Sequence, residues 1–335
     1  MILAFSPAIS KVRRRIAPAT SKHKKLTMKI AIPDLISNSY FPVIAAVELG
    51  MFKREGLDVD LELVVPVEKA LAALGDGSLE FLGCSSHLVV GGFPEWHGAK
   101  LLCAQAQGMY WFLVMRSDLN AAPGDLSAVK GRRIGAAHWV AMALRQLLIE
   151  SGIDPVRDNV EIAPIPGAHD AGMSFGVMAA QALEERRVDG FWANGIGAEL
   201  AVRRGVGTVV LDARRDPAAP DYTMACVVAS DRLIAERPEI AAAAVRAITG
   251  AQQALRSDVT LATTIGRKLF PAAEAELIAD IVRRDLPFYS PVISRDAIER
   301  MIGFSQAAGV LKRHPAYEEV VATQFAPLWT GNRPG

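Results

Sequence analysis

The chain has 335 residues, of which 51% are hydrophobic and 22% are charged, and its formal net charge is +1. This length is enough for two domains with sizeable cores. The high hydrophobic content excludes a disordered chain, and the near-neutral charge gives no reason to expect nucleic acid as a partner. No run of about 18 apolar residues occurs, so we predict no membrane-spanning segment.

The first 27 residues are basic, contain no acidic residue and are interrupted by prolines. Their apolar opening is too short for the hydrophobic region of a secretory signal peptide. Met28 directly precedes the first expected strand, so an upstream start added to a protein that begins there is one explanation. We predict that residues 1–27 form a disordered extension.

Strands and helices alternate from residue 29 onward. The first unit has a strand at 29–33, a polar turn, a helix at 41–53 and a second strand at 57–63. A unit of this kind requires a parallel strand pair and a right-handed crossover. The loop after the first strand therefore lies at the carboxyl edge of the sheet, where open α/β sheets bind ligands.

The remaining chain continues the alternation and then becomes helical. Further strands are expected at residues 79–82, 100–106, 109–115, 132–136, 160–165, 188–192, 208–211 and 224–229. Further helices are expected at residues 68–74, 88–92, 140–151, 174–187, 196–204, 239–256, 260–269, 272–284 and 294–308. Because no strands are left for the helical tail, we expect it to pack on the first lobe. The α/β pattern then predicts lobe one at 28–115 plus 222–335 and lobe two at 116–221.

Four segments in this order resemble one family. GMFKREGLDVDLEL is similar to the segment after the first helix of ABC-transporter substrate-binding proteins of the nitrate, sulfonate, taurine and thiamine-precursor type. The similarity continues in DLSAVKGRRIGAA, RRVDGFWANGIGAEL and VVASDRLIAERPEIAAAAVRAI. It implies a type II periplasmic binding protein-like fold, in which two α/β lobes joined by two hinge strands close over a small molecule. The chain departs from the family in having no visible signal peptide and no arginine or lysine cluster in its loops.

Loops that follow strands should converge on the cleft between the lobes. The first loop offers Asn38 and Ser39, which can form hydrogen bonds with a ligand, and Tyr40, which can stack on it. The alternative is that Ser39 caps the following helix and Tyr40 is the apolar residue of a hydrophobic staple. The second offers Ser85 and Ser86, whose hydroxyls at a helix start suit a carboxylate or sulfonate.

The first crossing between the lobes offers Gln105 and Tyr110, which could reach the cleft. His138 and Trp139 stand between a strand and a helix, where an aromatic side chain is a platform for a flat ligand. Burial of Trp139 in the core is the alternative.

The loop after the strand at 188–192 offers Asn194 and Gly195, preceded by Trp192. Asn194 can cap the next helix, and glycine lets the backbone approach a ligand closely. His169 and Asp170 lie in a glycine-rich loop that could act as a lid, although a solvated turn is the simpler interpretation.

The sequence contains none of the common catalytic motifs GxxxxGK[ST], HExxH, GxSxG or GxGxxG. Their absence does not exclude an enzyme. From the family resemblance we predict a monomeric solute-binding protein, and not an enzyme, that binds an organic acid, sulfonate or heterocycle without cofactor or metal. The resemblance implies delivery of this ligand to an ABC permease and a location in the periplasm, with the cytoplasm as the alternative. A cytoplasmic ligand sensor has the same sequence features.

The alternative function is a cytoplasmic enzyme on the same scaffold. Aromatic-sulfinate desulfinases and yeast-type thiamine-pyrimidine synthases resemble this family, but the former carry a cysteine in the first loop and the latter a cysteine-rich segment. This chain has Asn38 and Ser39 in that loop. Cys84 could act as a nucleophile only if His87 activated it, and buried thiols are the simpler interpretation of the cysteines.

Overall fold

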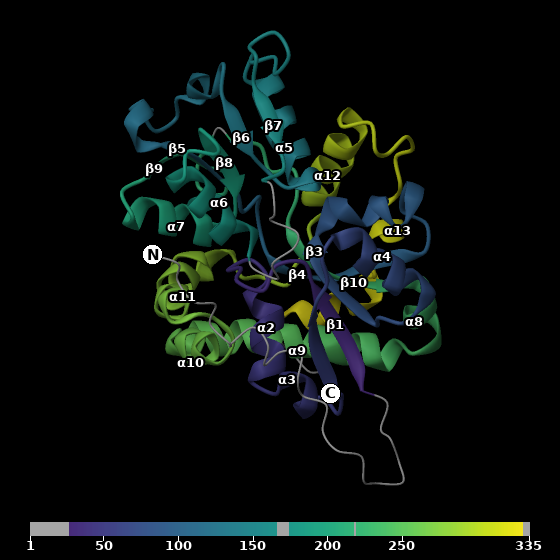
Figure 1. The fold of residues 1–335 in the computed structure, drawn as a ribbon. Helices are drawn as coiled ribbons and strands as arrows, with labels where there is room; N and C mark the ends of the chain where they lie inside the picture. The colour runs from purple at the N-terminus through teal and green to yellow at the C-terminus, as the bar shows by residue number, and fades with distance from the viewer. Residues whose placement is uncertain (1–26, 166–173, 218, 331–335) are drawn as a thin grey trace.

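The computed structural model describes residues 27–165, 174–217 and 219–330. They form two five-stranded mixed sheets, with strand orders β2-β1-β3-β10-β4 and β7-β6-β8-β5-β9. Helices cover both sheets, so that each sheet is the centre of one lobe (Figure 1). The expected two-lobe α/β architecture is confirmed. The predicted N-terminal extension, apart from Thr27, and the possible lid at His169 and Asp170 lie outside the described residues.

The first sheet places the central parallel strand β1 between β2 and β3, and β10 antiparallel between β3 and β4. Because β10 follows all the strands of the second sheet in the chain, the chain leaves the first lobe and returns to it. The strands of this sheet are β1 (Met28–Ile32), β2 (Val59–Leu63), β3 (Phe81–Ser85), β4 (Ala99–Ala106) and β10 (Ala225–Ser230).

Two expectations in the first lobe need correction. The helix expected at 41–53 is split into α2 (Phe41–Glu48) and α3 (Met51–Arg54), because Gly50 takes a left-handed conformation with φ 70° that interrupts the helix. The loop expected at 83–87 is also shorter, since β3 continues to Ser85 and leads directly into the 3₁₀ helix η1 (Ser86–Gly91). Ser85 therefore ends a buried strand. Helix α4 (Val67–Asp76) forms close to its expected position.

The second sheet combines parallel pairs at β6 with antiparallel pairs at β5. Since β5 belongs to this sheet, the first crossing precedes Phe112, whereas the sequence boundary was expected after residue 115. Its strands are β5 (Phe112–Arg116), β6 (Arg133–Gly135), β7 (Glu161–Ala163), β8 (Gly190–Ala193) and β9 (Gly207–Asp212). Its helices are α5 (His138–Glu150), α6 (Phe175–Glu184) and α7 (Gly195–Arg203).

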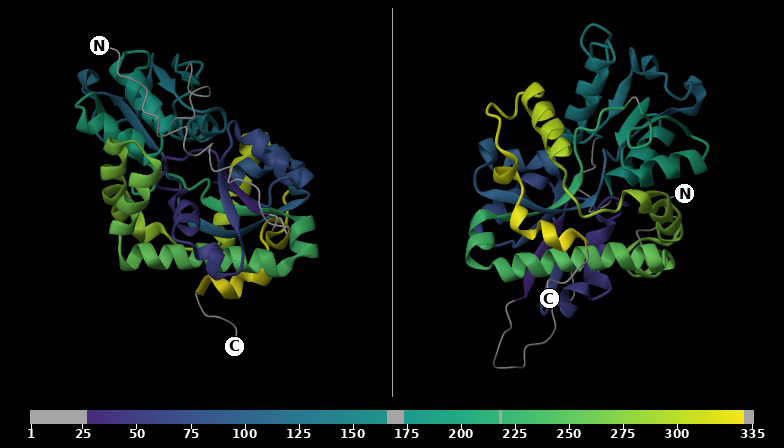
Figure 2. Two further views of the ribbon diagram at one scale, coloured as in Figure 1. Left: turned by 60° about the horizontal axis from the view of Figure 1, so that its bottom comes forward. Right: turned by 180° about the vertical axis from the view of Figure 1, so that it is seen from behind.

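The tail begins at Ser230, whose side chain caps α8 by accepting the N–H of Leu233 at 3.2 Å. The long helix α9 then runs below the first sheet and packs against α2, α3 and β4 (Figure 2). The helices of the tail are α8 (Asp231–Glu236), α9 (Pro238–Ser257), α10 (Thr260–Leu269), α11 (Ala272–Asp285), α12 (Arg295–Ala307) and α13 (Tyr317–Val320). Short 3₁₀ segments are η2 (Pro94–Trp96), η3 (Ser117–Leu119), η4 (Leu126–Val129), η5 (Leu286–Phe288) and η6 (Thr323–Thr330).

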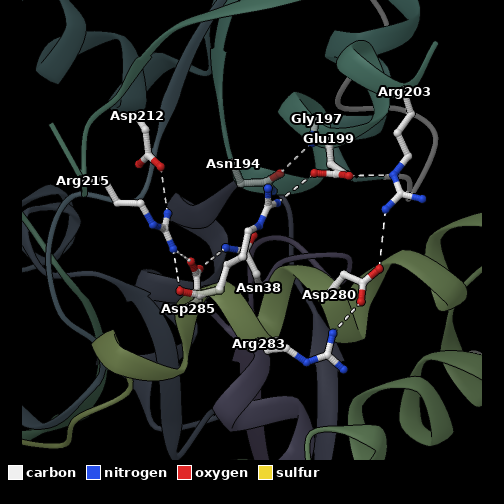
Figure 3. A network of polar contacts seen from close by, with 11 residues as sticks. Asn38, Asn194, Gly197, Glu199, Arg203, Asp212, Arg215, Asp280, Arg283 and Asp285 are labelled. Atoms are coloured by element: carbon white, nitrogen blue, oxygen red, sulfur yellow. Dashed lines mark hydrogen bonds and ion pairs between the residues drawn. The ribbon is translucent and has the colours of Figure 1, made fainter.

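The tail contacts both lobes, and not only the first as expected. Helix α11 packs against α7, and α12 packs against α5. Ion pairs join Arg284 to Glu199 at 2.9 Å and Asp280 to Arg203 at 3.6 Å across the first of these contacts (Figure 3). The helical tail therefore connects the lobes in addition to the two chain crossings.

Membrane-spanning helices and clusters of metal-binding side chains are both absent from the described ranges. None of the helices there combines the length and the apolar character that crossing a bilayer requires. Over the same residues, no three His, Cys, Asp or Glu side chains are grouped so that they could hold a metal ion.

Candidate ligand-binding site

A cavity of about 540 Å³ lies between the two lobes. The first lobe contributes residues that follow β1, β2 and β3, and the second lobe contributes the starts of α5, α6 and α7. These are the strand-to-helix edges at which open α/β sheets bind ligands. Among the residues predicted from the sequence, those that line the cavity are Tyr40, Ser85, Tyr110, His138, Trp139 and Asn194.

Three hydroxyl groups form a cluster on the first-lobe side. The phenol oxygen of Tyr110 shares hydrogen bonds of 2.6 Å with both Ser85 Oγ and Tyr40 Oη. Burial raises the pKa of both tyrosines above its ordinary value, so both phenols stay neutral and can donate hydrogen bonds. The N-cap of α2 is Tyr40, and no side chain caps this helix, so the capping alternative for Ser39 is wrong.

Trp139 faces this cluster from the second lobe, in the first turn of α5. Its indole Nε1–H donates to Glu68 Oε1 of α4 at 2.8 Å, which joins the two lobes at the cavity. The ring also lies against Gly91 of η1: a Cβ atom at that glycine would lie only 2.5 Å from the ring carbon Cζ2. The indole is therefore held on two sides while it lines the cavity.

Asp34 is a cavity residue that the sequence analysis missed. It follows β1 and accepts hydrogen bonds from Asn194 Nδ2 at 2.8 Å, Ser174 Oγ at 3.1 Å and the N–H of Ile36 at 3.1 Å. Asn194 and Ser174 belong to the second lobe, so the carboxyl joins both lobes. Burial raises the pKa of Asp34 to about 7, although these hydrogen bonds act to lower it.

Asn194 has the two roles that the sequence suggested as alternatives. Its side-chain oxygen accepts the N–H of Gly197 at 3.4 Å and so caps α7, as expected. The amide nitrogen of the same side chain reaches across to Asp34. The cap thus fixes the orientation in which the amide presents its donor to the other lobe.

Ser37 is a second cavity residue that was missed. Its side chain is fully buried, and its Oγ has no hydrogen-bond partner among the described residues. A buried polar atom without a partner carries a free-energy cost that a ligand can remove. Other cavity residues that were not predicted are Pro33, Val65, Pro66, Val67, Glu68, Leu88, Trp111, Ala137, Val140, Phe175 and Ala193.

Several predicted residues do not line the cavity. Ser86 Oγ lies 3.0 Å from Thr223 Oγ1, and the amide of Gln105 donates to the carbonyl of Cys226 at 2.9 Å. Trp192 is fully buried in the core beside Trp111. Ser86 and Gln105 thus bond to other residues of the protein, and all three side chains lie outside the cavity lining.

Asn38 and Ser39 of the first loop also do not line the cavity. The Asn38 amide donates to the carboxylate of Asp285, and Ser39 is fully buried. A Cβ atom at Gly195 would lie 3.1 Å from Asn38 Oδ1, so this glycine allows a close approach between the lobes and not to the cavity. The prediction that these residues line the cleft is not met by the cavity found here.

His87 does not line the cavity, and burial keeps its imidazole neutral. Its Nε2 lies 3.3 Å from the carbonyl oxygen of Trp139 and its Nδ1 lies 3.0 Å from Thr223 Oγ1. Because a carbonyl only accepts, the proton is placed on Nε2. Burial lowers the pKa of His87 to about 4, so the imidazole is uncharged at neutral pH.

None of the three cysteines, Cys84, Cys103 and Cys226, lines the cavity, and all are free and fully buried. Burial raises the pKa of Cys84 to about 12, and that of Cys103 and Cys226 also lies above the ordinary value. A thiol in this environment is not ionised at neutral pH and is a poor nucleophile. The interpretation of the cysteines as buried thiols is confirmed, and both ring nitrogens of His87 contact residues other than Cys84.

Comparison with known proteins agrees with this geometry. The sequence profile of the family described as NMT1/THI5 like matches residues 37–258, which is more than half of the chain. YtlA of Bacillus subtilis, described as a proposed binding protein, is 24% identical over 342 residues, which covers 95% of this chain and 94% of YtlA.

Solved structures share the fold at low identity. The periplasmic aliphatic sulphonate binding protein SsuA of Escherichia coli has a TM-score of 0.67 at 12% identity, covering 88% of this chain and 91% of SsuA. The desulfurization enzyme DszB, seen with biphenyl-2-sulfinic acid, has a TM-score of 0.62 at 18% identity, covering 91% of this chain and 99% of DszB. The resemblance to ABC substrate-binding proteins inferred from the sequence is confirmed, and the chain belongs to the NMT1/THI5-like family.

Proposed function

We propose that the chain is a solute-binding protein whose two lobes close over a small organic molecule. The observation that carries the proposal is a cavity that is lined by residues of both lobes. Hydrogen bonds between the lobes border this cavity: Ser174 and Asn194 donate to Asp34, and Trp139 donates to Glu68. A volume of about 540 Å³ suits a small organic ligand. Closure of two lobes about chain crossings is a common way to enclose such a ligand.

The cavity walls combine aromatic surfaces with a few polar groups, which is the usual composition of a small-molecule site. Tyr40, Tyr110 and Trp139 give aromatic contact, and Ser37 and Ser85 give hydroxyl groups. In this proposal the closed, monomeric protein delivers its ligand to an ABC permease from the outer side of the membrane, in the periplasm. The sulphonate-binding function of SsuA supports transport as the class of function.

Ligand-induced stabilisation tests the proposal. The melting temperature of the protein is measured with a panel of organic acids, sulfonates, amines and pyrimidines, because a ligand at a hundred times its Kd adds about 2.7 kcal/mol to the free energy of unfolding. Tyr110→Phe should weaken the effect of any stabilising compound, whereas Tyr317→Phe on α13, far from the cavity, should leave it unchanged. Absence of stabilisation by every panel member, or loss of it in both variants, would contradict the proposal.

An enzyme on this scaffold is the second candidate, and one observation favours it. The pKa of Asp34, raised to about 7 by burial, lies near neutral pH, where a general acid or base works best. The full burial of all three cysteines, none of which lines the cavity, argues against cysteine-dependent chemistry. Mass spectrometry of each stabilising compound after incubation decides between the two: recovery of intact compound supports binding, and a new product supports catalysis.

A further inference from the structure

The ionisable groups around the cavity are mainly acidic. Asp34 lies on its inner side, half-buried, and Glu68 lies at an exposed position. Among the described residues that line the cavity there is no lysine or arginine, and His138 is the single histidine. A site built for a carboxylate or sulfonate would be expected to offer guanidinium or ammonium groups.

The hydrogen-bond partners of Asp34 are all neutral. They are the hydroxyl of Ser174, the amide of Asn194 and the backbone N–H groups of Ile36 and Phe175, and no lysine or arginine of the described chain forms an ion pair with this carboxyl. When Asp34 ionises, its charge is stabilised by dipoles alone. The raised pKa of Asp34 agrees with a carboxyl that lacks a cation beside it.

One guanidinium that lies behind the Tyr110 ring is paired with a carboxylate through its Nη1 atom. The Cζ atom of Arg214 lies 5.7 Å from the centroid of the Tyr110 ring, but its Nη1 contacts the carboxylate of Asp285 at 2.6 Å. Arg214 does not line the cavity. An anionic ligand would have to compete with Asp285 for this charge, and Tyr110 separates the two.

The walls suit the body of a cationic ligand. Indole and phenol rings of Trp111, Trp139, Tyr40 and Tyr110 line the cavity, and the faces of such rings attract cations. The buried hydroxyl of Ser37, which has no partner among the described residues, can accept a hydrogen bond from an N–H group. This unpartnered oxygen indicates a ligand contact independently of the acidic charge.

We propose that the cavity selects a cationic nitrogen base, an ammonium or amidinium group on an aromatic or alicyclic body, with Asp34 as its counter-ion. Glu68 supplies further negative potential, and Ser37 accepts from the nitrogen. The proposal rests on the proposed binding function and names the class of ligand for the same site. It excludes a sulfonate as the preferred ligand, although SsuA, which shares the fold, binds one.

Three small probes of similar shape and different charge test the proposal. Benzamidine is a cation, benzamide is neutral and benzoate is an anion, and their affinities for the full chain are measured by isothermal titration calorimetry at pH 7.5. We expect benzamidine to bind at least about tenfold more tightly than benzamide, and benzoate to bind more weakly than both, because one unit of charge difference beside a partly buried carboxylate is worth at least this factor.

Variants that each remove one negative charge show which carboxyl causes the preference for a cationic ligand. Asp34→Asn should reduce the preference for benzamidine over benzamide about tenfold, while Glu68→Gln, at the more exposed carboxyl, should reduce it less. Asp60→Asn, at an exposed carboxyl of β2, makes the same change in net charge and should leave the preference unchanged. The order of the three wild-type affinities decides the proposal even if Asp34→Asn does not fold.

The outcomes separate the ligand class from the function. Tighter binding of benzoate or benzenesulfonate than of benzamidine would overturn the ligand class and leave the binding function standing. If none of the probes binds, the class is decided by the charge of whichever panel compound stabilises the protein: a cation supports it, and a neutral or anionic compound overturns it. Failure of every probe and every panel compound would overturn the binding function, and the ligand class with it.

Discussion

The guanidinium of Arg214 lies 2.6 Å from the carboxylate of Asp285, and both side chains are almost fully buried, at 2% and 3% exposed. Arg214 follows β9 of the second sheet, and Asp285 ends α11 of the helical tail. Arg215 adds a contact of 2.8 Å to the same carboxylate, and the Asn38 amide donates to it from the first loop (Figure 3). One carboxylate thus joins the first loop, the second crossing and the tail.

Removal of the charge on Asp285 should be strongly destabilising. In Asp285→Asn the buried guanidinium of Arg214 loses its counter-ion, and we expect the free energy of unfolding to fall by about 3–5 kcal/mol in urea denaturation. Asp280→Asn is the control on the same helix, because its pairs with Arg203 and Arg283 are exposed and should contribute about 0–1 kcal/mol. Equal losses in the two variants would contradict this role of Asp285.

Gly91 should tolerate no larger side chain without loss of binding. A Cβ atom there would lie 2.5 Å from the Trp139 ring, so Gly91→Ala should displace the indole from the cavity wall and cost about 1–3 kcal/mol in stability. Gly303→Ala in α12 is the control, because no atom lies within 4 Å of its Cβ position and alanine favours helix. Thermal unfolding and ligand titration of both variants check this, and an unaltered Gly91→Ala protein would refute it.

Asp34 should make the stability depend on pH. Its pKa is raised from 3.8 to about 7 in the folded protein, so the folded state binds more protons than the unfolded state between about pH 4 and 7. Its contribution is therefore fully present below pH 4 and is lost as the pH rises through 7. We expect the stability of the wild type minus that of Asp34→Asn to fall with increasing pH across this window, as measured by chemical denaturation. A flat difference would show that the carboxyl is not desolvated.

His87 should make the stability of the protein increase with pH. Its pKa is lowered from 6.5 to about 4, so the unfolded state binds more protons between these pH values, and the contribution to stability increases as the pH rises from 4 to 6.5. The expected change is about 3 kcal/mol over this window, at about 1.4 kcal/mol for each pH unit. His87→Gln should lack this increase when denaturation is followed at several pH values. An unchanged profile would assign the effect to another group.

The cysteines should be unreactive in the folded protein. All three side chains are fully buried and their pKa values are raised. Reaction with a thiol-specific chromogenic disulfide should therefore be negligible in native buffer and complete in denaturant. Rapid labelling of Cys84 in native buffer would reopen the cysteine-dependent enzyme interpretation.

Local sequence patterns were sufficient for most elements but not for all their limits. The helix expected at 239–256 matches α9 closely, and the Ser294 side chain caps α12 by accepting the N–H of Ala297 at 3.2 Å. The break at Gly50 was missed because a single glycine within a helical pattern does not show which conformation it takes. The contact of α11 with α7 depends on side chains far apart in the chain.

Only part of the site could be predicted from the sequence, because its geometry also depends on side chains that are far apart in the chain. Tyr40 and Trp139 stood out as aromatic residues at helix starts, and both line the cavity. Asn38 looked equally suitable, but its partner, Asp285, lies 247 positions along the chain and cannot be identified from local sequence. Asp34 was not predicted, although the first polar residue after a buried strand is a signal that could have identified it.

The central claim is that the lobes close over a small molecule held between them. Small-angle X-ray scattering of the full chain, with and without the panel compound that binds most tightly, tests it directly. We predict that the radius of gyration decreases as the compound saturates the protein, because the hydrogen bonds of Asp34 and Trp139 join the lobes in the closed form. A compound that binds at saturation without changing the radius of gyration would contradict the claim.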